Sequence, residues 1–172
     1  MSLLAPFVVV DVQYDGSRGS AAAVVGADFR TAEVLEERVA AVPDVAPYRP
    51  GAFYERELPC ILAVLAQVSA KVRAVIVDGY VDLDDAGRPG LGAHLHHKLR
   101  SGVVVIGVAK TRFAGATSAR EVIRGASRSP LFVTARGLAV EEAAELVRTM
   151  HGPYRIPTLL GRADRLARGR DG

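Results

Sequence analysis

The chain has 172 residues, of which 49% are apolar, and a formal net charge of +3. This length fits one compact domain over residues 1–172, and no stretch contains the ~20 apolar residues that a membrane-spanning helix needs. The single cysteine, Cys60, excludes an internal disulfide, and the apolar run near the start is too short for the core of a signal peptide. We therefore expect a cytoplasmic protein with no membrane partner.

The excess of positive charge suits a polyanionic partner, and the charge is unevenly distributed along the chain. Arginines gather in two stretches, the first containing Arg112, Arg120, Arg124 and Arg128 and the second Arg155, Arg162, Arg165, Arg168 and Arg170. The guanidinium group matches the geometry of phosphate. Both stretches are candidates for contacts with a phosphate backbone, and an ordinary solvated surface is the equal alternative.

The first part of the chain predicts three strands. Residues 7–14 are apolar and β-branched and end at Asp15-Gly16, which is a turn signal. Small residues at 20–25 indicate a second strand, and the loose alternation at 34–42 indicates a third. Because the connections are short, we expect an antiparallel meander.

The middle of the chain predicts a helix followed by a β-α-β unit. Apolar residues recur at helical spacing over 53–69. The strand at 73–77 has no polar alternation, which is typical of a central strand covered on both faces. A helix through Leu91, Leu95 and Leu99 then leads to a second apolar strand at 103–108. We expect these two strands to be parallel, with a right-handed crossover.

The last part of the chain predicts a short strand at 131–134, a helix at 140–150 and a basic helix at 159–168. The whole order is therefore three antiparallel strands, a helix, and then parallel strands with flanking helices. That is the order of a mixed α/β sheet of the ribonuclease H-like class. We predict this fold for the chain.

Three acidic residues lie at positions where a divalent metal would explain them. Asp11 lies inside the first apolar strand, where a carboxylate is costly unless it is paired, hydrogen-bonded or bound to a metal. Asp78 ends the strand at 73–77, and Glu57 lies early in the preceding helix. The first strand and this strand are neighbours in a ribonuclease H-like sheet, so we expect Asp11 beside Asp78. All-oxygen ligation favours Mg²⁺, with Mn²⁺ as a substitute, over zinc.

Lys110 follows the strand at 103–108 and is placed to point toward the same acids. There it would neutralise a phosphate or orient an attacking water. The plainer alternatives are that Lys110 is an ordinary exposed lysine and that Asp78 is a turn former. Neither alternative explains Asp11.

Short motifs along the chain resemble those of the endonuclease V family, in the order in which the family has them. They are Asp11-Val12-x-Tyr14, Pro47-Tyr48-Arg49-Pro50-Gly51, Arg56-Glu57-Leu58-Pro59, Val77-Asp78-Gly79, Ile106-Gly107-Val108-Ala109-Lys110 with Gly115, Pro130-Leu131-Phe132-Val133, Tyr154-Arg155-Ile156-Pro157 and Arg162-Ala163-Asp164. No single motif is specific, but their joint order covers most of the chain.

The resemblance implies a ribonuclease H-like fold and an Mg²⁺-dependent endonuclease. Such an enzyme cuts the second phosphodiester bond on the 3′ side of a deaminated purine, hypoxanthine (inosine), and leaves a 5′-phosphate. It implies a role in DNA repair, so we expect nucleic acid as the partner, DNA rather than RNA. We take a monomer as the working expectation.

The resemblance also assigns roles residue by residue. It implies that Asp11, Glu57 and Asp78 hold the metal, that Lys110 assists at the phosphate, and that Asp164 takes the place of a further His or Asp beside the metal. The wedge that fills the gap left by a displaced base would be Tyr48 with Pro47 and Pro50. The glycines that let the backbone approach that base would be Gly79, Gly107 and Gly115.

The segment after Asp78-Gly79 is one place where the chain departs from the family pattern. After Asp78-Gly79 the family has a His-Pro-Arg sequence, whereas residues 80–89 here contain three acids and no histidine. Asp84 or Asp85 would then be an added metal ligand or would repel DNA. A non-catalytic or altered-specificity nucleic-acid binder of the same fold is therefore the alternative to an active nuclease.

Two other hypotheses have weaker support. His94 and His97 are spaced to share a helix face, which would suit zinc, but no cysteine or His-Glu-x-x-His pattern accompanies them. An unrelated α/β enzyme that acts on a phosphorylated small molecule would need a phosphate-binding loop, and the chain has no Walker pattern.

Overall fold

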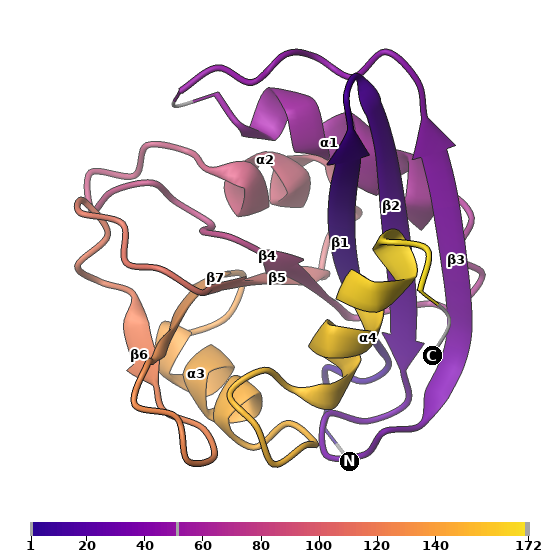
Figure 1. Ribbon diagram of the computed structural model, residues 1–172. Coiled ribbons are helices and arrows are strands. Elements are labelled where there is room, and N and C mark those ends of the chain that lie inside the picture. Colours follow the sequence, from indigo (N-terminus) through magenta and orange to yellow (C-terminus); the bar gives the residue numbers. More distant parts are fainter. Residues whose placement is uncertain (1, 51, 171–172) are drawn as a thin grey trace.

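The computed structural model describes residues 2–50 and 52–170. Its centre is a mixed sheet with helices on both faces (Figure 1). Seven strands lie in the order β3-β2-β1-β4-β5-β7-β6. The chain forms β1 (Phe7–Asp15), β2 (Arg18–Gly26), β3 (Val34–Val42), α1 (Tyr54–Leu65), β4 (Ala74–Asp78), α2 (Leu91–Lys98), β5 (Val104–Ala109), β6 (Arg120–Val122), β7 (Leu131–Arg136), α3 (Val140–Arg148) and α4 (Thr158–Ala167).

The predicted meander and the predicted parallel unit are both confirmed. β1 pairs antiparallel with β2, and β2 with β3, as the short turns indicate. β4 runs parallel to β1 on one side and to β5 on the other. The sheet therefore brings the carboxyl ends of β4 and β5 beside the middle of β1, so that Asp11 of β1, Asp78 of β4 and Lys110 after β5 lie in one region, the acidic edge.

The far side of the sheet differs from the prediction. β7 runs antiparallel to β5 rather than parallel, and a further short strand, β6, pairs antiparallel with β7. No helix connects β5 to β7 within the described residues, so the right-handed crossover that parallel pairing requires is missing. The strand β6 has three residues, only one of which is buried. Such a strand contains no apolar run, so the sequence pattern does not predict it.

The helix predicted over 53–69 ends at Leu65. The residues that follow are held in a loop by Glu36 of β3, whose carboxylate accepts hydrogen bonds from the backbone N–H groups of Ser69 and Ala70, the shortest at 2.7 Å. A side chain from a distant strand thus satisfies the amides that an extended helix would have used. No helix in the described part of the chain has both the length and the hydropathy needed to cross a membrane.

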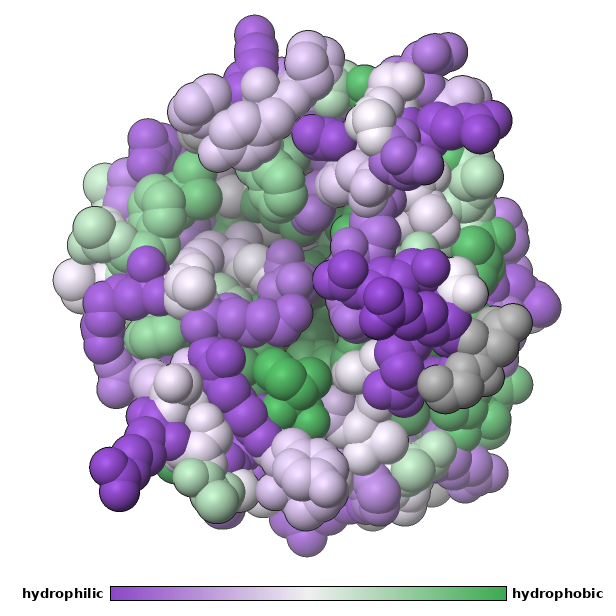
Figure 2. All heavy atoms as spheres, viewed as in Figure 1, coloured by the Kyte–Doolittle hydropathy of each residue, from purple (hydrophilic) through white to green (hydrophobic). Residues whose placement is uncertain are grey.

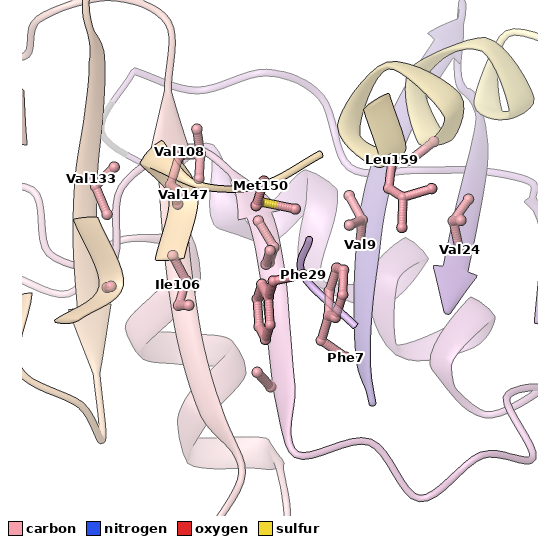
Figure 3. Packing of buried hydrophobic residues seen from close by; sticks show 14 of the residues in the cluster. Phe7, Val9, Val24, Phe29, Ile106, Val108, Val133, Val147, Met150 and Leu159 are labelled. Carbon is pink, nitrogen blue, oxygen red and sulfur yellow. The ribbon is translucent and has the colours of Figure 1, made fainter. Parts of the chain in front are cut away.

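The two faces of the sheet carry separate cores because alternate residues of a strand point to opposite sides. Phe7 and Val9 pack under α3 and α4, where the rings of Phe7 and Phe29 stack at 4.1 Å between centroids (Figure 3). Val8 and Val10 pack under α1 and α2. This alternation decides which helix each polar side chain at the sheet edge meets.

Candidate metal and nucleic-acid site

Asp11 and Asp78 occupy adjacent positions on neighbouring parallel strands. Val10 of β1 is in register with Val77 of β4, and the two aspartates come next along their strands. Neighbouring strands lie about 4.8 Å apart. By the alternation along each strand, both carboxylates belong to the face that α4 covers, and both line a small hollow of about 220 Å³. Figure 2 shows this face hollowed near its centre, with a hydrophobic floor and hydrophilic side chains around it.

Glu57 approaches the same edge from the opposite face. It lies in the first turn of α1 and is only 9% exposed, and among the described residues its carboxylate has no hydrogen-bond partner. Burial, together with the nearby charges of Asp78 and Asp11, raises the pKa of Glu57 to about 8. Burial and the charge of Asp78 likewise raise the pKa of Asp11 to about 6. The three carboxylates therefore destabilise one another when all are ionised.

Gln13 joins Asp11 to Asp164. Its Nε2 donates to Asp11 Oδ2 at 3.3 Å and to Asp164 Oδ1 at 3.1 Å. Asp164 lies on α4 and also accepts from Arg168 Nε at 3.1 Å. Burial acts to raise the pKa of Asp164, but the hydrogen bond from Arg168 and the charges nearby outweigh it, so the pKa is lowered.

Gln13 was missed by the sequence reasoning. It falls on the variable position of the first motif, Asp11-Val12-x-Tyr14. The signal that would have found it is the period of two along a strand, which puts residue 13 on the same face as residue 11.

Lys110, the residue after β5, contacts the acidic edge. Its Nζ lies 3.5 Å from Asp78 Oδ2, and both side chains are about half exposed. The ammonium group is thus beside the carboxylates and open to solvent, where an anionic ligand can reach it. This agrees with the position expected for Lys110 and leaves its role a prediction.

The donor set at this edge fits a hard divalent cation. Three carboxylates face one region, one of them is buried without a hydrogen-bond partner, and the charge of Asp78 raises the pKa of both Asp11 and Glu57. A cation with oxygen ligands relieves that repulsion. Within residues 2–50 and 52–170, no three His, Cys, Asp or Glu side chains already surround one point closely enough to hold an ion. The side chains of Asp11, Glu57 and Asp78 would therefore have to turn inward on binding.

The histidines give no support to the zinc alternative. The ring of His94 stacks on Tyr54 with 3.6 Å between centroids, so it packs between α1 and α2. Burial, followed by the charge of His97, lowers the pKa of His94.

A cleft of about 900 Å³ opens beside Glu57, Asp78 and Lys110. We call it the wedge cleft, and it is also lined by Tyr48, Pro50, Phe53, Tyr54, Gly79, Tyr80, Leu83, Arg88, Gly90, Leu91, Ala109, Thr111, Arg112 and Phe113. Tyr48 is 59% exposed, and its ring meets Phe53 edge-on at 6.0 Å. Pro47 is exposed but does not line the cleft, and Gly51 of the same motif lies outside the described residues.

Of the three glycines expected near a base, only Gly79 lines the wedge cleft. Gly79 has φ +138°, a conformation that favours glycine. A Cβ on Gly107 would lie 2.4 Å from the carbonyl oxygen of Gly79 and 2.6 Å from Thr134 Oγ1. A Cβ on Gly115 would lie 2.9 Å from Asp84 Cβ. Contacts within the protein therefore already favour glycine at positions 107 and 115, and the approach of these two residues to a base stays a prediction.

The acids of the segment 80–89 hold the loop together. Asp82 pairs with Arg136 at 2.8 Å. Asp84 accepts from the backbone N–H groups of Ala86 and Arg88, and Asp85 accepts from Ser118 N and the hydroxyl of Thr117. Asp84 and Asp85 are thus engaged in loop contacts, which argues against their being added metal ligands.

Most arginines expected at phosphates have partners inside the protein. Arg124 is buried and donates to the carbonyl oxygens of Met150 and Gly152 at 2.6 and 3.0 Å. Arg155 donates to the carbonyl of Lys110 at 2.6 Å. The ion pairs are Arg112–Glu121, Arg120–Glu141, Arg162–Glu37 and Arg168–Asp164. The first arginine stretch therefore serves largely to fix the loops around β6, not to present a basic surface.

Comparison of the sequence with known proteins gives one family. The sequence model of the endonuclease V family matches residues 4–165. The chain is 38% identical over 144 residues to endonuclease V of Streptomyces coelicolor, covering 83% of this chain and 58% of that protein. It is 32% identical over 180 residues to endonuclease V of Streptomyces avermitilis, covering 92% of this chain and 77% of the relative.

Solved structures agree. The crystal structure of the Streptomyces avermitilis endonuclease V is 29% identical and superposes with a TM-score of 0.78, covering 96% of this chain and 80% of that one. A Ciona intestinalis endonuclease V, in complex with a 24mer DNA containing an inosine followed by a ribo-adenosine, superposes with a TM-score of 0.83 over 98% of this chain and 87% of that one. At 20% identity, the second likeness shows the fold alone.

Proposed function

The chain belongs to the endonuclease V family, and from this we propose that it is an Mg²⁺-dependent endonuclease that cuts nucleic acid next to a deaminated purine, hypoxanthine (inosine). The observation that carries the proposal is the edge where Asp11 and Asp78 lie side by side and the buried, unpartnered Glu57 meets them. We take DNA as the substrate and repair of deaminated bases as the role. The relatives that match are named endonucleases.

The metal would be held by Asp11, Glu57 and Asp78, with Asp164 held close by through Gln13. A bound Mg²⁺ supplies charge stabilisation at a phosphate and lowers the pKa of water. Lys110 adds a positive charge beside Asp78, where it would bind a non-bridging oxygen of the scissile phosphate. Hydrolysis at this edge would leave a 5′-phosphate and a 3′-hydroxyl.

The wedge cleft would hold the displaced base. Extrusion of a modified base costs less than extrusion of a normally paired one, and an exposed aromatic ring can take its place in the stack. Tyr48 supplies such a ring at the rim of the cleft. Tyr80 and Phe113 supply apolar surface inside it, their ring centroids 5.9 Å apart.

The Tyr80 hydroxyl is already used within the protein, because it donates to the Thr111 carbonyl at 2.7 Å and accepts from Phe113 N at 2.9 Å. In this arrangement Tyr80 would contact a base by stacking and would not read its edge.

The alternative function is a binder that does not cut. The segment 80–89, which lacks the family's histidine, favours it. Its acids are engaged in loop contacts and leave Asp11, Glu57, Asp78 and Lys110 unobstructed, so we rank the nuclease first.

A nicking assay separates the two functions. The protein is incubated with Mg²⁺ and labelled single-stranded DNA containing one inosine, in parallel with EDTA and with Asp11→Asn. Glu142→Gln removes one exposed carboxylate on α3, which lines neither the wedge cleft nor the hollow beside Asp11, and serves as the matched control. We expect nicking that EDTA and Asp11→Asn abolish and Glu142→Gln leaves intact. Binding without nicking by the wild type would refute the nuclease and support the binder.

The same assay tests the finer points. An RNA strand with one inosine tests the choice of DNA as the substrate. A product whose 5′ end carries no phosphate that phosphatase can remove would refute the predicted position of bond cleavage. We further propose that the protein is a monomer, which sedimentation would check. We also propose that it works in the cytoplasm, because a single cysteine fits a reducing compartment.

A further inference from the structure

A second groove, lined by other residues than the wedge cleft, lies next to the acidic residues. We call it the arginine groove. It encloses about 700 Å³ between the β1–β2 turn, the end of β3 and the end of α4, which lies over β1 and β2 in Figure 1. It is lined by Gln13, Tyr14, Asp15, Arg18, Gly19, Ser20, Ala41, Val42, Pro43, Ala167, Arg168, Gly169 and Arg170.

The arginine groove begins at the candidate metal site. Gln13 lines it and at the same time donates to Asp11 and Asp164. Arg168 also lines it and pairs with Asp164 at 3.1 Å. The wedge cleft and the arginine groove have no lining residue in common. Asp78 lines the wedge cleft, whereas Gln13, which holds Asp11, lines the arginine groove, so the pair of aspartates connects the two. A strand cut at these carboxylates would therefore enter from one and leave through the other.

The charges of the groove suit a polyanion. Three arginines line it against one acid, Asp15. Unlike the arginines around β6, Arg18 and Arg170 have no side-chain partner among the described residues, so their guanidinium groups are available to a ligand. A spread of arginines along an open groove matches repeated phosphates more closely than one small anion.

We propose that the arginine groove binds the sugar-phosphate backbone of the cut strand on the 3′ side of the scissile bond. The direction rests on the proposed function: if the damaged base occupies the wedge cleft and the cut falls on its 3′ side, the strand that continues past the carboxylates is the 3′ arm. Arg18 and Arg170 contact its phosphates, while Arg168 is held by Asp164 at the entrance.

Two inosine-containing single strands with the same 5′ arm test this. One ends just beyond the cut bond, and the other continues with a long 3′ arm. Binding is measured by fluorescence anisotropy without metal at several salt concentrations, for the wild type and for Arg18→Ala/Arg170→Ala. The control is Lys71→Ala/Arg73→Ala, which removes two exposed charges at the opposite end of β4.

The wild type should bind the long-arm strand more tightly than the short-arm strand. The Arg18/Arg170 variant should lose most of that advantage, roughly 3- to 10-fold in affinity for the long-arm strand. The slope of its log binding constant against log salt concentration on that strand should fall in magnitude by about 1.4, which is about 0.7 for each of two phosphates that are no longer neutralised. The control should keep the advantage. An unchanged advantage in the Arg18/Arg170 variant, an equal loss on both strands, or the same loss in the control would overturn the proposal.

Failure of the proposed function has a different signature. The wild type could fail to nick the inosine strand with Mg²⁺ and still bind the long-arm strand more tightly through Arg18 and Arg170. That result would refute the nuclease and support backbone binding in the arginine groove. Normal nicking without that dependence would refute the groove alone.

Discussion

The side chain of Gln13 on β1 donates a hydrogen bond to Asp164 on α4, at 3.1 Å between residues that lie 151 positions apart in the sequence. The same amide holds Asp11 at 3.3 Å. One side chain therefore sets the distance between the carboxylate in the middle of the sheet and the carboxylate of the last helix. Groups that orient metal ligands in this way affect metal binding strongly without touching the metal.

Gln13→Ala should leave the fold intact and lower the rate of nicking by roughly 10- to 100-fold, with a higher Mg²⁺ concentration needed for half-maximal rate. The reason is that Asp11 and Asp164 lose the amide that connects them. Mg²⁺ titrations of the nicking rate measure both effects. Gln67→Ala removes an exposed amide after α1 and should match the wild type. A Gln13→Ala enzyme with an unchanged Mg²⁺ requirement would contradict a positioning role.

Glu57→Gln should make the metal-free protein more stable and abolish its response to Mg²⁺. The buried carboxylate has no hydrogen-bond partner, and burial with the charges of Asp78 and Asp11 raises its pKa to about 8. At neutral pH the unfolded chain, with the ordinary pKa of 4.5, holds Glu57 ionised, so folding requires this carboxyl to take up a proton, a cost in stability that a neutral Gln avoids. Without metal, we expect the midpoint of thermal unfolding of Glu57→Gln to be about 3 °C higher than that of the wild type, which corresponds to about 1 kcal/mol in the free energy of unfolding for a chain of this size. Thermal unfolding with and without Mg²⁺ measures this, with Glu142→Gln as the exposed control. An Mg²⁺-induced shift that survives Glu57→Gln would remove Glu57 from the ligand set.

Tyr48→Ala should slow the nicking of duplex DNA more than that of single-stranded DNA. A duplex leaves a gap when the base is extruded, and the ring of Tyr48 would fill it, whereas a single strand has no gap to fill. The expected loss of kcat/KM on the duplex is roughly 10-fold, within the range for one stacking contact. Tyr154→Ala, at a tyrosine that is 75% exposed and does not line the wedge cleft, is the control. Equal losses on the two substrates would argue against a wedge.

The ion pair of Glu37 with Arg162 should stabilise the protein in a pH-dependent way. Its two contacts, at 2.7 and 2.9 Å, connect β3 to the helix that carries Asp164. The hydrogen bond from Arg162 lowers the pKa of Glu37 below its ordinary value of 4.5. Between the lower folded value and 4.5, the unfolded chain binds more protons, so the stabilisation is complete above about pH 4.5 and is lost as the pH falls through the folded value.

Glu37→Gln should therefore cost about 1 kcal/mol in the free energy of unfolding at neutral pH, and the difference from the wild type should shrink on acidification. Urea unfolding over a pH series measures it. Glu33→Gln, at an exposed residue in the turn before β3, should show no such trend. A cost for Glu37→Gln that is constant over the acid range would refute the assignment.

The strand order from β1 to β5 and the acidic edge could be predicted because they leave local signals. An apolar run of alternating residues specifies a strand, and a carboxylate within one, such as Asp11, is costly enough to demand an explanation. The register that puts Asp11 beside Asp78 then follows from the parallel pairing of β1 with β4.

The partners of polar side chains were decided by the tertiary structure alone. The arginines of the first stretch look alike in the sequence, yet Arg124 is buried among backbone carbonyls and Arg120 pairs with Glu141. The direction of β7, the close packing around Gly107 and the contact of Gln13 with Asp164 also depend on residues far apart in the chain. The spacing of apolar residues in the sequence indicates on which face of its own helix or strand a residue lies. Which distant helix or strand covers that face depends on how the whole chain packs.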